Sequence, residues 1–289
     1  MGLRELGYRP YEGERLPPRE ATGPLLRHGL RRAWAHWLVK LALLTGWVPV
    51  VVAGVYDVVR LFAQRTFATQ MAGAEPVFPH HDDFVFALLR WQAWLFASLV
   101  ALGAGAGAVS GDLGKGALVF YLSRPVTREQ YLLSRVGAVG LWSFLLLFVP
   151  GLLMVLLATG LAPPEMRGTE LALLVPTAAF SLLVAVVFST VSVGISALSA
   201  SRATTMTAWL LVFLVPEVFG GLVEAATGAP WVRLASLPTL LVAVGRPLFR
   251  LEAPAEGVQW FHALPILVAA SVLSLWASWR RLGRVEVVS

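Results

Sequence analysis

The sequence predicts an all-α integral membrane protein that crosses the bilayer six times. The chain of 289 residues is 57% hydrophobic and only 14% charged, whereas soluble domains carry about 25% charged residues. Six apolar runs are each long enough for a transmembrane helix, which needs about 20 residues. The length suits a single membrane domain, and there is no cysteine for disulfides or thiol chemistry.

The N-terminal segment is expected to have two parts. Residues 1–21 are polar and proline-rich, with no apolar period and no signal-peptide core, and are predicted to form a disordered cytoplasmic tail. A helix is predicted from Pro24, and it carries arginines mostly on one face. Apolar residues recur along its other face: Leu26, Leu30, Ala33, Trp34 and Trp37. This pattern indicates a helix lying in the membrane interface; the alternative is that it is the polar end of the first span.

The six spans define one predicted membrane domain over residues 22–289. Their ranges are 38–62, 84–109, 134–160, 171–199, 204–226 and 262–280. An even number of spans places both termini on the same side of the membrane. Fifteen of the 23 Lys and Arg residues fall in the segments on that side and five in the opposite loops. Because positive charges accumulate in cytoplasmic loops, both termini are predicted to be cytoplasmic.

Prolines and glycines indicate how these spans pack. Five of the six contain a proline, which favours a kink, although proline is also tolerated in membrane helices. The second span has none and carries Gly103, Gly107 and Gly111 at intervals of four. Such a face permits close approach of another helix. That helix belongs either to the same chain, which is our expectation, or to a second copy.

The polar stretch 110–135 carries helix signals although it lies between two spans. Asp112 is predicted to N-cap a short helix that continues to about Ser123. Pro125 ends that helix, because the residue before a proline is disfavoured in the α region. Thr127-Arg128-Glu129-Gln130 has the T-x-x-Q pattern of a capping box that opens the next helix. A loose linker needs no such caps, so a partner is expected to grip this segment.

This stretch resembles the cytoplasmic loop before the third span of type-2 ABC exporter permeases, in particular the NosY-like branch. The family pattern is an acidic residue, a Gly-Thr four positions on, a Leu-Leu-Ser-x-Pro-x-Ser-Arg run and a later basic residue. The matching residues are Asp112, Gly116-Ala117, Leu122–Arg128 and Arg135. Two positions depart from the pattern, since Ala117 replaces the Thr and Gly114 stands where a second acidic residue is usual. With the six-span layout the resemblance covers nearly the whole chain.

The resemblance implies the permease subunit of an ATP-driven exporter in the cytoplasmic membrane of a bacterium. It implies a homodimer that binds two copies of an ATPase subunit, which holds ATP and Mg. The residues implied to couple the two proteins are Asp112, Gly116, Phe120, Tyr121, Arg124, Pro125 and Arg128. In this interpretation Asp112 caps the coupling helix and the aromatic rings pack into the ATPase. Arg124 and Arg128 then pair with acidic groups of the ATPase or with anionic lipid.

The chain itself is not expected to be an enzyme. Its nearest approach to a phosphate-binding loop, Gly111 to Gly116, has the wrong spacing, and Gly116 instead of Ser or Thr follows Lys115. No cofactor is therefore expected on this chain. Its net charge of +6 is explained by the positive-inside rule, so no nucleic-acid partner is expected either.

Residues 227–261 are predicted to form one or two helices at the outer surface. The apolar stretch from Trp231 to Phe249 suggests a seventh span, but two arginines and two prolines argue against it. A seventh span would also place the C-terminal arginines outside, against the charge bias. The type-2 exporter resemblance likewise implies outer helices between the fifth and sixth spans.

Acidic residues supply two further candidate sites. Glu217 and Glu224 are seven residues apart in the fifth span, so they share a helix face, and acids at membrane depth usually face a cavity or a partner. They are the candidate substrate-path residues; the alternative is that both lie near the outer headgroups. The cluster His80, His81, Asp82 and Asp83 offers metal ligands. An N-cap role for one of the aspartates explains it as well, and no metal is expected.

Two other functions stay open on the sequence alone. A non-transporting scaffold would use the same ATPase to act on a periplasmic partner through residues 227–261. An ion-coupled secondary transporter would need an ionisable group deep in the membrane, and Glu217 is the one plausible candidate. The sequence does not identify the substrate.

Overall fold

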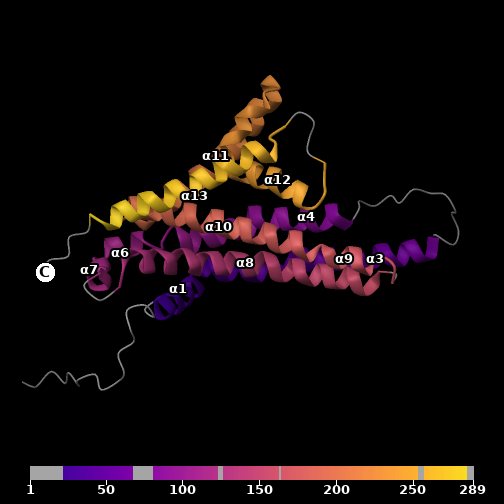
Figure 1. The fold of residues 1–289 in the computed structure, drawn as a ribbon, viewed down its shortest axis with the longest axis horizontal. Coiled ribbons are helices and arrows are strands. Elements are labelled where there is room, and N and C mark those ends of the chain that lie inside the picture. Colours follow the sequence, from indigo (N-terminus) through magenta and orange to yellow (C-terminus); the bar gives the residue numbers. More distant parts are fainter. Residues whose placement is uncertain (1–21, 68–80, 123–125, 163, 253–256, 285–289) are drawn as a thin grey trace, which may run out of the picture.

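The computed structural model describes residues 22–67, 81–122, 126–162, 164–252 and 257–284. This part of the chain is helical and contains no β-strand (Figure 1). Within these described ranges, six helical segments are long and apolar enough to cross a membrane, so the predicted all-α, six-span architecture is confirmed. They are Trp37–Val59, Asp82–Gly114, Arg128–Leu161, Arg167–Leu198, Arg202–Thr227 and Trp260–Leu282. The tail predicted over residues 1–21 lies outside the described residues.

The first span is preceded by a separate helix, α1 (Thr22–Ala35), and is itself divided into α2 (Trp37–Thr45) and α3 (Trp47–Phe67). His36 separates α1 from α2 and caps α2, because its Nδ1 accepts a hydrogen bond from the backbone N–H of Leu38 at 3.3 Å. Helix α1 packs along α8, where the rings of Trp34 and Trp142 stack 5.2 Å apart. One face of α1 is thus covered by protein.

The second span is the most irregular of the six. It consists of α4 (His81–Gln92), the π-helix η2 (Ala93–Ala97), α5 (Ser98–Val100), the π-helix η3 (Ala101–Gly105) and α6 (Ser110–Gly114). In η3 the N–H of Ala106 bonds to the carbonyl of Ala101, five residues back, at 2.8 Å. Such wide turns shift the residues that follow around the helix axis and occur often at functional sites.

The middle of the chain forms the core of the bundle. A short helix α7 (Ala117–Leu122) leads to the long α8 (Arg128–Leu161), followed by α9 (Arg167–Ala172) and α10 (Leu174–Leu198). Helix α10 packs against α8 on one side and α13 on the other. Its side chains are almost all buried from Val187 to Ala197, which makes α10 the central helix of the fold.

The last part of the chain contains α11 (Arg202–Thr227), the 3-10 helix η4 (Pro230–Ala235), α12 (Leu237–Leu248) and α13 (Trp260–Leu282). Figure 1 shows α11 leaving the bundle at a steep angle. Only four of its 26 residues are buried. By contrast α12 is drawn into the bundle against α13 and α10, and six of its 12 residues are buried. Helix α12, which belongs to the segment predicted to lie at the outer side of the membrane, is therefore packed against the bundle.

The prolines do not all have the same effect. Pro49 and Pro176 each lie at the third residue of a helix, just after the breaks that separate α2 from α3 and α9 from α10. Pro150, Pro216 and Pro265 lie inside continuous helices. A proline in the first turn lacks only an N–H that has no intrahelical partner there, which explains why two of the five coincide with helix starts.

Candidate functional site

A buried carboxylate lies where the second span ends. Asp112, in α6, is 4% exposed. Its Oδ2 accepts hydrogen bonds from Arg135 Nη2 and from the Tyr131 hydroxyl, both at 2.7 Å, and its Oδ1 accepts one from Arg32 at 2.5 Å. This group, called the Asp112 node below, ties α6 to α1 and to α8.

The Asp112 node also holds the short helix α7. The Arg135 side chain is only 3% exposed, and its guanidinium lies over the rings of Tyr131 at 4.9 Å and Tyr121 at 5.5 Å. Cation–π contacts of this kind add to the ion pair. Because a buried charge is costly without a partner, Arg135 and Asp112 depend on each other. Tyr121 connects α7 to Arg135 and to Tyr131.

The predicted N-cap role of Asp112 is wrong. Helix α6 begins at Ser110, and Asp112 lies inside its first turn. The N–H groups of Val109 and Ser110 instead donate to the hydroxyl of Ser196 on α10, at 3.0 and 2.9 Å. A side chain 86 residues away in sequence therefore supplies the cap, and the carboxylate is free to bind arginine.

The helix predicted to continue to about Ser123 is also interrupted. Gly116 has φ +66°, a left-handed conformation that glycine adopts without steric cost, and it separates α6 from α7. The predicted capping box is confirmed: Thr127 and Gln130 exchange hydrogen bonds of 3.0 and 3.2 Å at the start of α8.

The other predicted coupling residues are described to different extents. Arg128 is exposed at the start of α8, and Tyr121 is half-buried beside Arg135. Phe120 lies in α7, but its side chain is outside the described part of the chain. Arg124 and Pro125 lie outside the described residues altogether.

The glycines of the second span lie against side chains of the same chain. A Cβ at Gly103 would lie 2.8 Å from His36 Nδ1, one at Gly107 2.9 Å from Arg202 Nε, and one at Gly111 2.6 Å from Arg32 Nη2. The closest approach involves a glycine that the four-residue pattern missed. A Cβ at Gly105 would lie 2.0 Å from the hydroxyl oxygen of Ser192 on α10.

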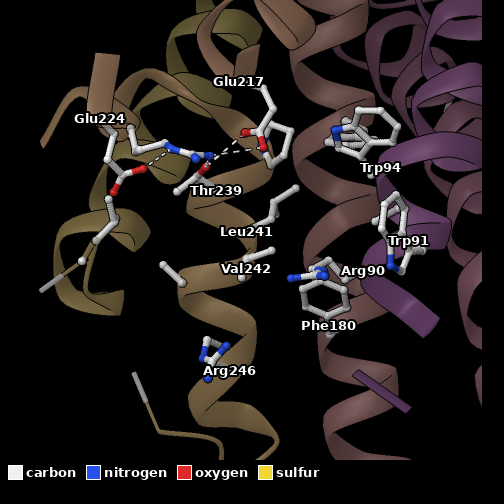
Figure 2. A pocket seen from close by; sticks show the side chains of 17 residues that line it. Arg90, Trp91, Trp94, Phe180, Glu217, Glu224, Thr239, Leu241, Val242 and Arg246 are labelled. Carbon is white, nitrogen blue, oxygen red and sulfur yellow. Dashed lines mark hydrogen bonds and ion pairs between the residues drawn. The ribbon is translucent and has the colours of Figure 1, made fainter. Parts of the chain in front are cut away.

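A cavity of about 540 Å³ opens between α4, α10, α11 and α12. Figure 2 shows its two walls: α11, η4 and α12 on one side, and Arg90, Trp91, Trp94 and Phe180 on the other. Trp94 belongs to the π-helix η2. Apolar walls with a few charged groups are typical of a site for a small or amphipathic molecule.

The predicted acids both line this cavity, and one arginine holds them. Glu217 and Glu224 both pair with the guanidinium of Arg233, with N–O distances of 3.5 and 2.7 Å. Figure 2 shows the two acids on this wall of the cavity. Glu217 also accepts hydrogen bonds from the hydroxyls of Ser236 and Thr239. The sequence analysis used Arg233 only as an argument against a seventh span and did not predict its pairing with the glutamates. Its position nine residues after Glu224 was the signal that could have indicated the pairing. The ion pairs fasten α11 to η4.

Two further arginines leave the cavity with an excess of positive charge. Arg90 and Arg246 line it, and neither has a carboxylate partner among the described residues. Arg246 donates instead to the backbone carbonyl of Glu252 at 2.8 Å, and Arg90 lies 5.9 Å from the ring of Trp91. Three arginines thus face two glutamates in one cavity.

Replacing Arg233 by alanine is expected to loosen this wall with little loss of stability. The three charged side chains are 24–34% exposed, so each pair contributes about 1 kcal/mol or less. A change of about 1 kcal/mol in free energy changes the population of the loosened conformation about fivefold. Because the chain has no cysteine, Leu241→Cys provides a single buried probe inside the cavity. Arg233→Ala should raise its thiol-labelling rate about fivefold.

Arg246→Ala is the matched control for that measurement. It removes an arginine from the same cavity but leaves both glutamate pairs intact. Equal labelling rates in the two variants would show that the glutamate–arginine pairs do not keep α11 and η4 together at the cavity.

The His80–Asp83 cluster is described only in part. His80 and the side chain of His81 lie outside the described residues. Asp82 and Asp83 lie within the first turn of α4, which begins at His81, so the alternative N-cap role for either aspartate is wrong. Their charges still favour a helix N-terminus electrostatically. Within the described residues, no three His, Asp or Glu side chains are placed to share a metal ion.

The chain matches a known protein family over more than half of its length. Residues 62–235 match the model of a family described as ABC-2 family transporter protein. The matched range contains Asp112, Arg135, Glu217, Glu224 and Arg233, whereas α1, α12 and α13 lie outside it. No curated protein matches the chain.

Proposed function

Because this chain belongs to the ABC-2 family of transporter proteins, we propose that it is the permease subunit of an ATP-driven exporter. The family implies a multi-pass membrane protein that works with an ABC ATPase subunit. We infer a complex of two copies of this chain and two of the ATPase in a bacterial cytoplasmic membrane. Both termini would be cytoplasmic, since positive charge concentrates at that side.

The Asp112 node is the observation that carries the proposal. It joins the α6–α7 segment to α8 by buried charge-assisted hydrogen bonds and to α1 by a partly buried one. Such bonds are about twice as strong as neutral ones. A force on α7 would therefore reach α8 through the contact of Tyr121 with Arg135, and α1 through Asp112. We propose that the ATPase docks on the α6–α7 segment and on Arg128, and that its closure moves these helices together.

The 540 Å³ cavity supports substrate transport over a purely mechanical scaffold. Figure 1 places α6 and α7 at one end of the bundle, and α12 lies away from that end beside α4. The cavity would then lie toward the outer side, with Glu217 and Glu224 on its wall. Export as the direction rests on the resemblance of residues 112–135 to type-2 exporter permeases.

ATPase docking can be tested by pull-down from the native membrane in a gentle detergent. We expect an ATPase chain to co-purify in equal amount with the tagged protein, as identified by mass spectrometry and an ATPase assay. Arg128→Ala and Phe120→Ala should each reduce its recovery about tenfold, the change produced by losing one or two interfacial contacts worth about 1.4 kcal/mol.

Arg27→Ala is the control, because Arg27 is also an exposed arginine at the α1 end of the bundle but lies outside the α6–α7 segment. Recovery unchanged in Arg128→Ala and Phe120→Ala would contradict docking on this segment. ATPase stimulation by a substrate in liposomes separates a transporter from a scaffold, because a scaffold should show none.

A further inference from the structure

A second cavity, distinct from the one in Figure 2, lies where α1 meets α2. Its volume is about 200 Å³. Four basic side chains from different parts of the chain line it: Arg32, His36, Arg135 and Arg202. None of the described lining residues is acidic. We call it the arginine pocket.

The charges in the arginine pocket are not balanced. Asp112 binds both Arg32 and Arg135, so a single carboxylate serves two arginines. Arg202 has no carboxylate partner among the described residues; it donates to the backbone carbonyl of Gly103 at 2.8 Å. Burial and the charge of Arg202 lower the pKa of His36, as expected where the local potential is positive.

Arg135 independently indicates a missing acceptor. Its side chain is 97% buried, yet its Nε has no hydrogen-bond partner among the described residues. Buried polar groups nearly always have a partner, and leaving one unpaired costs about 1–3 kcal/mol. Because Arg135 lines the pocket, a hydrogen-bond acceptor bound in the pocket would lie near the Arg135 side chain.

Small residues keep the pocket open. Gly29, Gly103 and Gly107 line it together with five alanines. A Cβ at Gly107 would lie 2.9 Å from Arg202 Nε and 3.1 Å from Arg202 Cζ. Glycine therefore allows the guanidinium to lie against the second span. The volume is several times the space of about 30 Å³ that one water occupies.

We propose that the arginine pocket binds a phosphate group, either the headgroup phosphate of an anionic lipid or a free phosphate. Guanidinium groups suit this ligand because they bind phosphate oxygens in pairs of hydrogen bonds. Basic pockets between transmembrane helices are known to take anionic lipid headgroups. Trp34 and Trp37, on either side of His36, are 46% and 65% exposed, as is usual for residues at a membrane interface.

The test uses the full chain, purified in detergent, with short-chain phosphatidylglycerol and inorganic phosphate as separate probes. Native mass spectrometry gives the lipid affinity, and competition by phosphate gives the affinity for the free ion. Arg202→Gln should weaken binding about tenfold or more, the effect of losing one charge-assisted hydrogen bond. Arg202→Lys retains the charge and should bind more tightly than Arg202→Gln.

Arg281→Gln removes the same charge from an exposed position in the last turn of α13, and should bind as the unchanged protein does. Gly107→Ala adds a steric test that keeps every charge, because its methyl group would displace the Arg202 guanidinium. If Arg202→Gln and Gly107→Ala weaken binding of the lipid and phosphate does not compete, the pocket is a lipid site. If phosphate competes with the lipid, the pocket also binds the free ion. Affinities equal to those of Arg281→Gln for both probes would overturn the proposal.

Discussion

Asp112→Asn is expected to destabilise the protein by about 3–5 kcal/mol, because it leaves a buried arginine without its charge partner. Arg135 is 3% exposed and its Nη2 lies 2.7 Å from Asp112 Oδ2. Asparagine has nearly the same shape but carries no charge, so the loss measures the electrostatic contribution and not packing. The single carbonyl oxygen of asparagine can replace only one of the two carboxylate oxygens, so either Arg32, bound to Oδ1, or Tyr131, bound to Oδ2, would also lose its acceptor.

The measurement is the free energy of unfolding in detergent, followed by helical circular dichroism. Glu165→Gln is the control, since it makes the same kind of change at an exposed position and should alter stability by less than about 0.5 kcal/mol. Asp112→Leu combined with Arg135→Met should recover much of the loss, because apolar pairs often replace buried ion pairs at no cost. A loss below about 1 kcal/mol in Asp112→Asn would contradict the Asp112 node as described.

The same variant tests the proposed coupling. If the Asp112 node transmits motion from α7, Asp112→Asn should reduce transport more than it reduces ATP hydrolysis. Measuring both rates in liposomes at a temperature where the variant is folded separates this effect from instability. Transport and hydrolysis reduced in the same proportion would show that the node does not couple them.

Gly105→Ala is expected to cost about 1–3 kcal/mol, the range for overpacking a filled core. The added Cβ would lie 2.0 Å from Ser192 Oγ and 2.6 Å from Ser192 Cβ. Rotating the hydroxyl relieves the first contact but not the second, because Cβ is fixed by the backbone of α10. The second span and α10 must therefore separate.

A compensating substitution makes this prediction specific. Ser192→Gly removes both clashing atoms and should restore stability in the double variant, whereas Ser192→Ala keeps the Cβ and should not. Gly168→Ala is the control, because a Cβ there meets nothing within 4 Å and alanine favours the helix by about 1 kcal/mol. Unfolding free energies of the four variants test the contact, and no difference between Gly105→Ala and Gly168→Ala would contradict it.

The sequence alone determined the architecture of this protein. Apolar runs of about 20 residues must form helices in a membrane, because every backbone polar group needs a partner inside its own segment. Six such runs therefore predicted the six spans. Signals that act over a few residues were equally readable, as the capping box of Thr127 and Gln130 shows. Glu217 and Glu224 were identified as candidate site residues because acids at membrane depth are rare.

Only the tertiary structure decided what these polar groups contact. Ser196, from α10, caps α6, so Asp112 is free to bind Arg32 and Arg135. Likewise Arg233 pairs with both glutamates because η4 turns back against α11. Side-chain partners depend on how separate helices meet, and the spacing along one helix does not contain that information. The two π-turns of the second span were likewise not predicted, because that span has no proline to mark an irregularity. An added Cβ at Gly103, Gly105 or Gly107 would lie within 3 Å of a side chain from another helix or its cap, and only the assembled fold shows these close approaches.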